Sequence, residues 1–210
     1  MFSAVIITAG RTGSQLICSN LVDYFNVEYH NDFNTYFKSG IVHTHNPMYM
    51  PPNNNFYCII SRRRNKFNAI LSGLITKYTG EISNYSSKKI NRIKIDVQSF
   101  TDAYLHYNVT YKLIEDRIYK HYNIIYRIID NSIFKETIEV YYEDLIEDPM
   151  HLFSLFNIDH KIEPFTLQSP YNYYELIENV DELNILYYQF EEQPLTVEQI
   201  NRVLKNLTNK

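Results

Sequence analysis

Apolar runs of strand length alternate with stretches of helical periodicity along this chain. Residues 3–8 (Ser-Ala-Val-Ile-Ile-Thr) and 56–61 (Phe-Tyr-Cys-Ile-Ile-Ser) are continuous runs, typical of strands buried on both faces of a parallel sheet. In residues 14–25 and 66–78, which follow these runs, apolar positions lie three and four residues apart, which predicts a helix after each strand. The alternation predicts an α/β fold of three layers, with a mainly parallel central sheet between layers of helices.

The rest of the chain continues the pattern less regularly. We expect further strands at 27–30, 41–43, 124–129 and 137–142, and further helices at 99–122, 143–156, 175–190 and 197–207. The length suits a single domain over 1–210, with a motif-bearing core of about 3–156 and a helical C-terminal part of about 157–210. Ligands of parallel α/β folds bind beyond the carboxyl ends of the strands. The loops after Thr8, His43, Ser61 and Tyr142 are therefore the expected functional loops.

Composition narrows the class of protein. A formal net charge of −4 argues against general nucleic-acid binding. The two cysteines, Cys18 and Cys58, are too few for a disulfide framework or a zinc site. No apolar run approaches the roughly 20 residues that span a bilayer, and the first residues lack the pattern of a signal peptide. We therefore expect a soluble cytoplasmic protein with neither a nucleic-acid nor a membrane partner.

Two of the five glycines lie three residues apart in the turn between the first strand and its helix. Such a turn presents free backbone N–H groups, and the helix N-terminus adds partial positive charge. The loop from Gly10 to Gly13 is therefore predicted to bind phosphate or another oxyanion, with Arg11 adding a guanidinium. No Lys precedes Ser14 as the Walker A pattern requires, which disfavours hydrolysis of nucleoside triphosphates.

Two further loops carry candidate chemistry. His43 and His45 follow a short strand, and histidine is the usual general base near neutral pH. We expect only one of the two to face the cleft and the pair not to bind one metal. The strand 56–61 runs into three successive arginines, whose charges require compensating anions or acidic side chains. Arg64 and Ser72, eight residues apart, are placed to reach one ligand group.

These loops, in this order, resemble the sulfotransferases that use 3′-phosphoadenosine 5′-phosphosulfate (PAPS). Residues 10–16 (Gly-Arg-Thr-Gly-Ser-Gln-Leu) resemble the family's phosphosulfate loop, and 43–47 (His-Thr-His-Asn-Pro) are similar to its Lys-Thr-His-Leu-Pro. Residues 64–72 keep the Arg, the Asn and the Ser of its 3′-phosphate signature. Residues 142–149 match its Tyr-Glu-Asp-Leu-x-x-Asp-Pro, a segment that we interpret as structural.

The resemblance implies transfer of a sulfuryl group from PAPS to a hydroxyl or amine of a small molecule or carbohydrate, without a metal. It implies that backbone N–H groups bind the phosphosulfate, that Arg11 neutralises charge on the leaving group, and that His45 is the base, with His43 the alternative. The residues that it assigns to the co-substrate are Arg11, Thr12, Gly13, Ser14, Arg64 and Ser72.

Two other functions stay open at this point. One is a protein that binds adenosine 3′,5′-bisphosphate without catalysing transfer. The other is a nucleotide or nucleoside kinase, which needs a loop Lys and a magnesium-binding carboxylate. The Lys is missing, and Asp130, after the strand expected at 124–129, is the candidate carboxylate.

Overall fold

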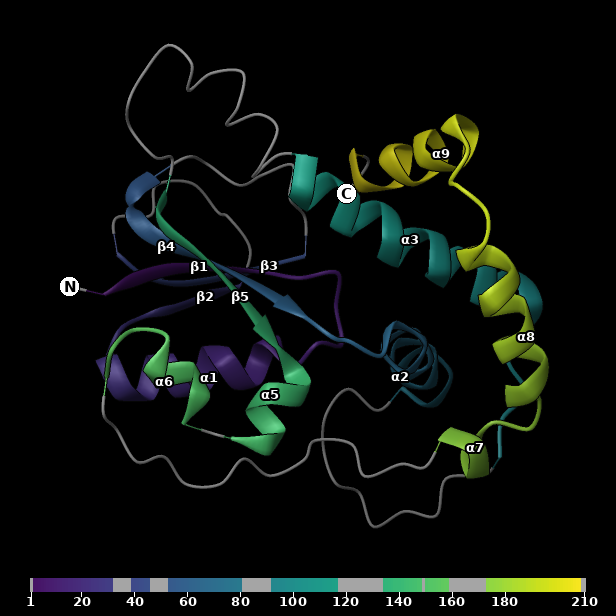
Figure 1. Ribbon diagram of the computed structural model, residues 1–210, viewed down its shortest axis with the longest axis horizontal. Coiled ribbons are helices and arrows are strands. Elements are labelled where there is room, and N and C mark those ends of the chain that lie inside the picture. The colour runs from purple at the N-terminus through teal and green to yellow at the C-terminus, as the bar shows by residue number, and fades with distance from the viewer. Residues whose placement is uncertain are drawn as a thin grey trace. The chain divides into compact units, whose positions relative to one another are not determined.

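The computed structural model describes residues 2–31, 39–45, 53–80, 92–116, 134–148, 150–158 and 173–208 (Figure 1). The chain forms two compact units, Met1–Arg64 with Thr110–Phe165, and Asn65–Val109 with Thr166–Lys210. The strands, all in the first unit, are β1 (Ser3–Ile7), β2 (Tyr29–Asn31), β3 (Gly40–Thr44), β4 (Asn53–Arg62) and β5 (Phe134–Tyr141). The helices are α1 (Ser14–Phe25), α2 (Lys66–Thr79), α3 (Val97–Glu115), α5 (Tyr142–Glu147), α6 (His151–Ser154), α7 (Tyr173–Leu176), α8 (Val180–Glu191) and α9 (Val197–Thr208).

The five described strands form one parallel sheet in the order β2-β3-β1-β4-β5. β1 lies at the centre and pairs with β3 on one side and β4 on the other, and every residue of β1 is buried. The continuous apolar run in the sequence is explained by this position, because a central parallel strand is covered on both faces. The predicted α/β fold with a parallel central sheet is confirmed.

Helices cover both faces of the sheet within the first unit. α1, α5 and α6 lie together on one face (Figure 1), where their apolar side chains pack against the strands. This core includes Cys18, Leu21, Ile59, Leu145 and Phe153. On the other face, the last turns of α3 reach the sheet, because the ring of Tyr111 lies 4.8 Å from the guanidinium carbon of Arg62 on β4. The three-layer arrangement follows.

The strand order also positions the functional loops. From β1 the chain passes to β2 and β3 on one side of the sheet, whereas from β4 it passes to β5 on the other. In open parallel sheets, adjacent strands whose connections leave in opposite directions open a crevice at their carboxyl ends. Here that place is bounded by the loop after Ile7 and by the arginines at the end of β4.

The second unit is helical. It consists of α2, most of α3 and the three C-terminal helices, so the predicted helical C-terminal part packs with a segment from the middle of the chain. Its polar centre is Glu191, which accepts a hydrogen bond of 2.9 Å from the Tyr104 hydroxyl and pairs with Lys66 at 3.3 Å. Among the described helices, none combines the length and apolarity needed to cross a bilayer.

Most predicted elements are observed, and α1 has the predicted bounds. The single helices predicted at 143–156 and 175–190 are wrong, since α5 and α6 are separate, and α7 ends before α8 begins. Asp148 ends α5 in an extended conformation (φ −136°), and Pro149 follows it; a residue before proline is disfavoured in the helical region. The strand predicted at 124–129 and Asp130 lie outside the described residues.

Candidate functional site

The loop after β1 has the backbone geometry of an anion-binding turn. Gly10, Arg11 and Gly13 all have positive φ (98°, 56° and 77°), and α1 begins directly after Gly13. Among the described residues, no acceptor contacts the N–H groups of Thr12, Gly13 or Ser14. Successive N–H groups in such a turn, at a helix N-terminus, form a concave site for an oxyanion.

Buried hydroxyl groups fasten this loop to the sheet. The Thr12 hydroxyl lies 2.6 Å from that of Thr8 and 2.8 Å from that of Ser61, and Ser61 donates to the Thr12 carbonyl at 2.9 Å. The Thr12 side chain is fully buried. Its hydroxyl therefore holds the loop against β4.

Ser14 and His43 are joined in the interior beside the loop. Nε2 of His43 lies 2.9 Å from the Ser14 hydroxyl, and both residues are buried. Burial, with a smaller contribution from the charge of His45, lowers the pKa of His43 to about 4. His43 is therefore neutral at pH 7, and its Nε2 is already engaged by Ser14.

His45 lies on the same side as His43. The two rings meet edge to face with their centroids 4.6 Å apart, and His45 is exposed. A Cβ built on Gly10 would lie 3.9 Å from Nδ1 of His45, so the ring borders the loop. The two rings share one side of the extended segment, as alternate residues do, but only His45 is exposed.

The three arginines at the end of β4 follow one scheme, in which each guanidinium lies over a tyrosine ring and beside a carboxylate. The tyrosine partners are Tyr111 for Arg62, Tyr142 for Arg63 and Tyr141 for Arg64, at 4.7–4.8 Å from guanidinium carbon to ring centroid. The carboxylates are Glu115 and Glu139 for Arg62, Glu143 for Arg63 and Asp144 for Arg64. Acidic side chains thus supply the compensation that the sequence required.

Tyr142 connects the loop to the arginines. A Cβ added to Gly13 would lie 2.5 Å from Cδ2 of Tyr142, so the ring packs directly on the glycine, and Arg63 lies over the same ring. Nε of Arg63 is buried and has no hydrogen-bond partner among the described residues. Arg63 is thus tied to the loop through one ring, whereas the sequence singled out Arg64. The match at 142–149 was the available signal, although it was interpreted as structural.

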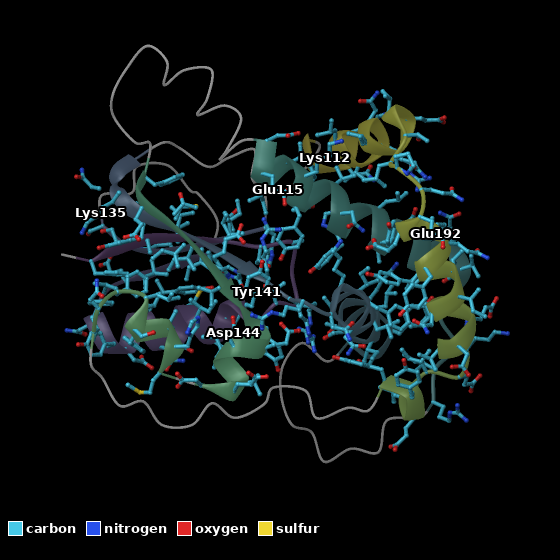
Figure 2. All side chains as sticks on the ribbon, in the orientation of Figure 1. Lys112, Glu115, Lys135, Tyr141, Asp144 and Glu192 are labelled. Atoms are coloured by element: carbon cyan, nitrogen blue, oxygen red, sulfur yellow. The ribbon has the colours of Figure 1, made fainter. Side chains whose placement is uncertain are left out.

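Arg64 forms a two-pronged contact with Asp144, of which the Nη2–Oδ2 distance is 2.8 Å (Figure 2 labels Tyr141 and Asp144, where β5 passes into α5). Its backbone N–H donates to Glu143 at 3.0 Å. The Arg64 side chain is 53% exposed, so the ion pair lies at the surface. Ser72 is buried on α2 in the second unit, and Asn65 caps that helix by accepting a hydrogen bond from Asn68 N–H at 2.9 Å.

Comparisons of this chain with protein-family models, with curated proteins and with solved structures give no match. The function therefore has to be argued from the residues and their geometry.

Proposed function

We propose that this protein is a PAPS-dependent sulfotransferase that moves a sulfuryl group to a hydroxyl or amine acceptor. One observation carries the proposal. At the carboxyl end of the central strand, the N–H groups of Thr12, Gly13 and Ser14 have no hydrogen-bond acceptor among the described residues. His45, which is exposed, borders this loop, and Arg63 lies over the ring of Tyr142, which packs on Gly13 of the loop. The order of these parts along the chain is that of the sulfotransferase motifs.

Sulfuryl transfer resembles phosphoryl transfer, in which a protein acts by positioning the reactants and stabilising charge. In the proposed mechanism the loop N–H groups hold the 5′-phosphosulfate, and the Ser14 hydroxyl assists. Arg11, half-buried between the two glycines, neutralises the charge that develops on the oxygen bridging phosphorus and sulfur.

His45 is the proposed general base. It is exposed at the border of the loop, where an acceptor hydroxyl can approach. His43 is buried, and its Nε2 is occupied by Ser14. A base must come within hydrogen-bond reach of the proton that it removes, which favours His45 over His43.

The 3′-phosphate is assigned to Arg64 and Ser72 on the resemblance alone. In the structure the Arg64 guanidinium is held by Asp144, so a phosphate bound there has to replace that carboxylate. Exposed ion pairs contribute little to stability, so the exchange costs little. Arg62 or Arg63 is the proposed auxiliary, and the ring of Tyr142, which contacts both Arg63 and Gly13 of the loop, favours Arg63.

The first experiment is isothermal titration of the full chain with adenosine 3′,5′-bisphosphate, AMP, and ATP with and without Mg²⁺. We expect adenosine 3′,5′-bisphosphate to bind at least tenfold more tightly than AMP, which lacks the 3′-phosphate. Preferential binding of ATP that requires Mg²⁺ would instead identify a kinase. Failure of adenosine 3′,5′-bisphosphate to bind would refute the proposal.

The second experiment measures transfer from labelled PAPS to a panel of alcohols, sugars and amines. Arg11→Ala is expected to lower the rate by about 10²–10³ because it removes a central electrostatic donor. Arg202→Ala, which removes an exposed arginine of α9 in the second unit, is the control and should keep the wild-type rate. Binding of adenosine 3′,5′-bisphosphate without transfer to any acceptor would identify a binding protein in place of an enzyme.

The base is tested by His45→Ala and His43→Ala in the same assay. His45→Ala should abolish transfer while leaving affinity for adenosine 3′,5′-bisphosphate within about twofold of wild type, since a base contributes to the chemical step. An active His45→Ala beside an inactive His43→Ala would reverse the assignment.

A further inference from the structure

A chain of hydrogen bonds runs from the anion-binding loop to the edge of the sheet. The Ser14 hydroxyl lies 2.9 Å from Nε2 of His43, and Nδ1 of His43 lies 3.3 Å from the Tyr29 hydroxyl. Tyr29 in turn donates to Oδ1 of Asn31 at 2.8 Å. Asn31 and His43 are register partners on β2 and β3, so the sheet itself sets this alignment.

The hydrogen bond from Tyr29 to Asn31 fixes the direction of the other two hydrogen bonds in the chain. Because the single hydroxyl proton of Tyr29 goes to Asn31, the Tyr29 oxygen can only accept from His43. Nδ1 of His43 then carries the ring proton, and Nε2 presents a lone pair. That lone pair accepts the proton of the Ser14 hydroxyl.

This direction turns the Ser14 proton away from the loop. The Ser14 oxygen donates to His43 and can offer only lone pairs to an anion on the neighbouring N–H groups. In the reverse order Tyr29 donates to Nδ1, Nε2–H donates to Ser14, and Ser14 donates to the anion. The low pKa of His43, about 4, keeps the ring neutral with a single N–H at pH 7, so the two orders exclude each other.

We propose that His43 is a positioning residue whose tautomer sets the direction of the Ser14 hydroxyl, and that an oxyanion in the loop reverses the chain from Ser14 to Asn31. The inference rests on the proposed function in one respect: the oxyanion is taken to be the 5′-phosphate of adenosine 3′,5′-bisphosphate. No atom moves far in this reversal, since only hydroxyl rotations and one imidazole proton change.

Asn31→Ala tests the reversal of the hydrogen-bond chain in the absence of a ligand. Asn31 is exposed at the end of β2, so its loss should not disturb the core. Without the Asn31 acceptor, we expect the Tyr29 hydroxyl to donate to Nδ1 of His43, which favours the Nε2–H tautomer before any anion binds. Long-range ¹H–¹⁵N spectra of histidine-labelled protein should show His43 as Nδ1–H in the wild type and shifted toward Nε2–H in Asn31→Ala. His43→Gln assigns the signal.

Affinity provides a second readout. Asn31→Ala should bind adenosine 3′,5′-bisphosphate about fivefold more tightly, which corresponds to the net free energy of about one hydrogen bond. In a Ser14→Ala background the same substitution should change affinity by less than about twofold, because the hydroxyl that His43 directs is gone. Asn201→Ala, an exposed asparagine of α9, is the matched control and should bind as the wild type does.

The outcomes separate the two proposals. An Nε2–H tautomer in the unliganded wild type, or no tautomer change in Asn31→Ala, overturns the inference whether or not a ligand binds. If adenosine 3′,5′-bisphosphate binds while His43 stays Nδ1–H, the inference is wrong and the proposed function stands. If the ligand does not bind at all, the proposed function is wrong and the anion-driven half of the inference falls with it.

Discussion

At Gly13 two separate constraints exclude a larger residue. Its φ of 77° lies in the left-handed region, which costs a residue with a Cβ about 1–2 kcal/mol. A Cβ there would also lie 2.5 Å from the Tyr142 ring. The glycine is therefore needed both for the shape of the loop and for the packing of the ring that lies between the loop and Arg63.

Gly80 is the matched comparison for this position. It has a similar φ of 70°, and a Cβ there would meet no atom within 4 Å. Gly80→Ala should lower the free energy of unfolding by about 1 kcal/mol, the backbone cost alone. Gly13→Ala should cost clearly more, about 3 kcal/mol, because the ring must also move. Urea unfolding of the two variants measures the difference, and equal losses would refute the packing argument.

His43 makes stability depend on pH. Its pKa is about 4 in the folded protein and about 6.5 in the unfolded chain, so the unfolded state takes up the proton first as pH falls. The stability linked to this group is complete above pH 6.5 and is lost as pH falls from 6.5 toward 4. Between pH 7 and pH 5 the loss should be about 2 kcal/mol. His43→Gln should remove this part of the pH dependence, and an unchanged pH profile in that variant would contradict the assignment.

Among the elements, the end of β4 and the start of α5 form a row of alternating charge and aromatic rings. This arrangement stabilises three adjacent guanidinium groups, but it also commits Arg64 to Asp144. A ligand phosphate at Arg64 therefore competes with a protein carboxylate.

Asp144→Asn tests this competition. Removing the charge should raise affinity for adenosine 3′,5′-bisphosphate by about two- to fivefold, the range expected for a surface ion pair, and leave affinity for AMP unchanged. Asp102→Asn breaks a comparable exposed pair with Arg202 in the second unit and should change neither. A fall in affinity for the bisphosphate on Asp144→Asn would show that Arg64 needs its carboxylate for binding.

Local pattern was sufficient to predict the elements of the first half of the chain. Periodicity located α1 and α2 closely, and continuous apolar runs located β1 and β4, because each of these signals lies within one element. The partners of Arg63 and Arg64 could not be predicted in this way. Glu143 and Asp144 lie about 80 residues further along the chain and are brought to the arginines only by the pairing of β4 with β5.

The same limit applies to the candidate site. Its loop and its two histidines were predicted from residue types at turns, whereas the bond between Ser14 and His43 depends on a tertiary contact across 29 residues. The role of Tyr142 was missed for the same reason: nothing near it in the sequence indicates that its ring covers Gly13.

For the molecule as a whole, charge argues against binding to nucleic acid. The net charge is −4, and the three adjacent arginines are matched by four neighbouring carboxylates. Counterion release requires unpaired basic groups on one surface. Random-sequence duplex DNA should therefore bind more weakly than about 10⁻⁴ M at 0.15 M salt, as measured by fluorescence anisotropy. Tighter binding that weakens steeply with salt would contradict this expectation.

The two cysteines offer a natural reporter on how often the interior opens. Cys18 and Cys58 are buried, and burial raises the pKa of the Cys18 thiol to about 12 and raises that of Cys58 as well. A thiol in this state reacts with an alkylating reagent only during transient exposure of the interior. The modification rate of each cysteine thus measures how often its surroundings open, without any introduced label, and can follow the protein through expression, storage and ligand screening.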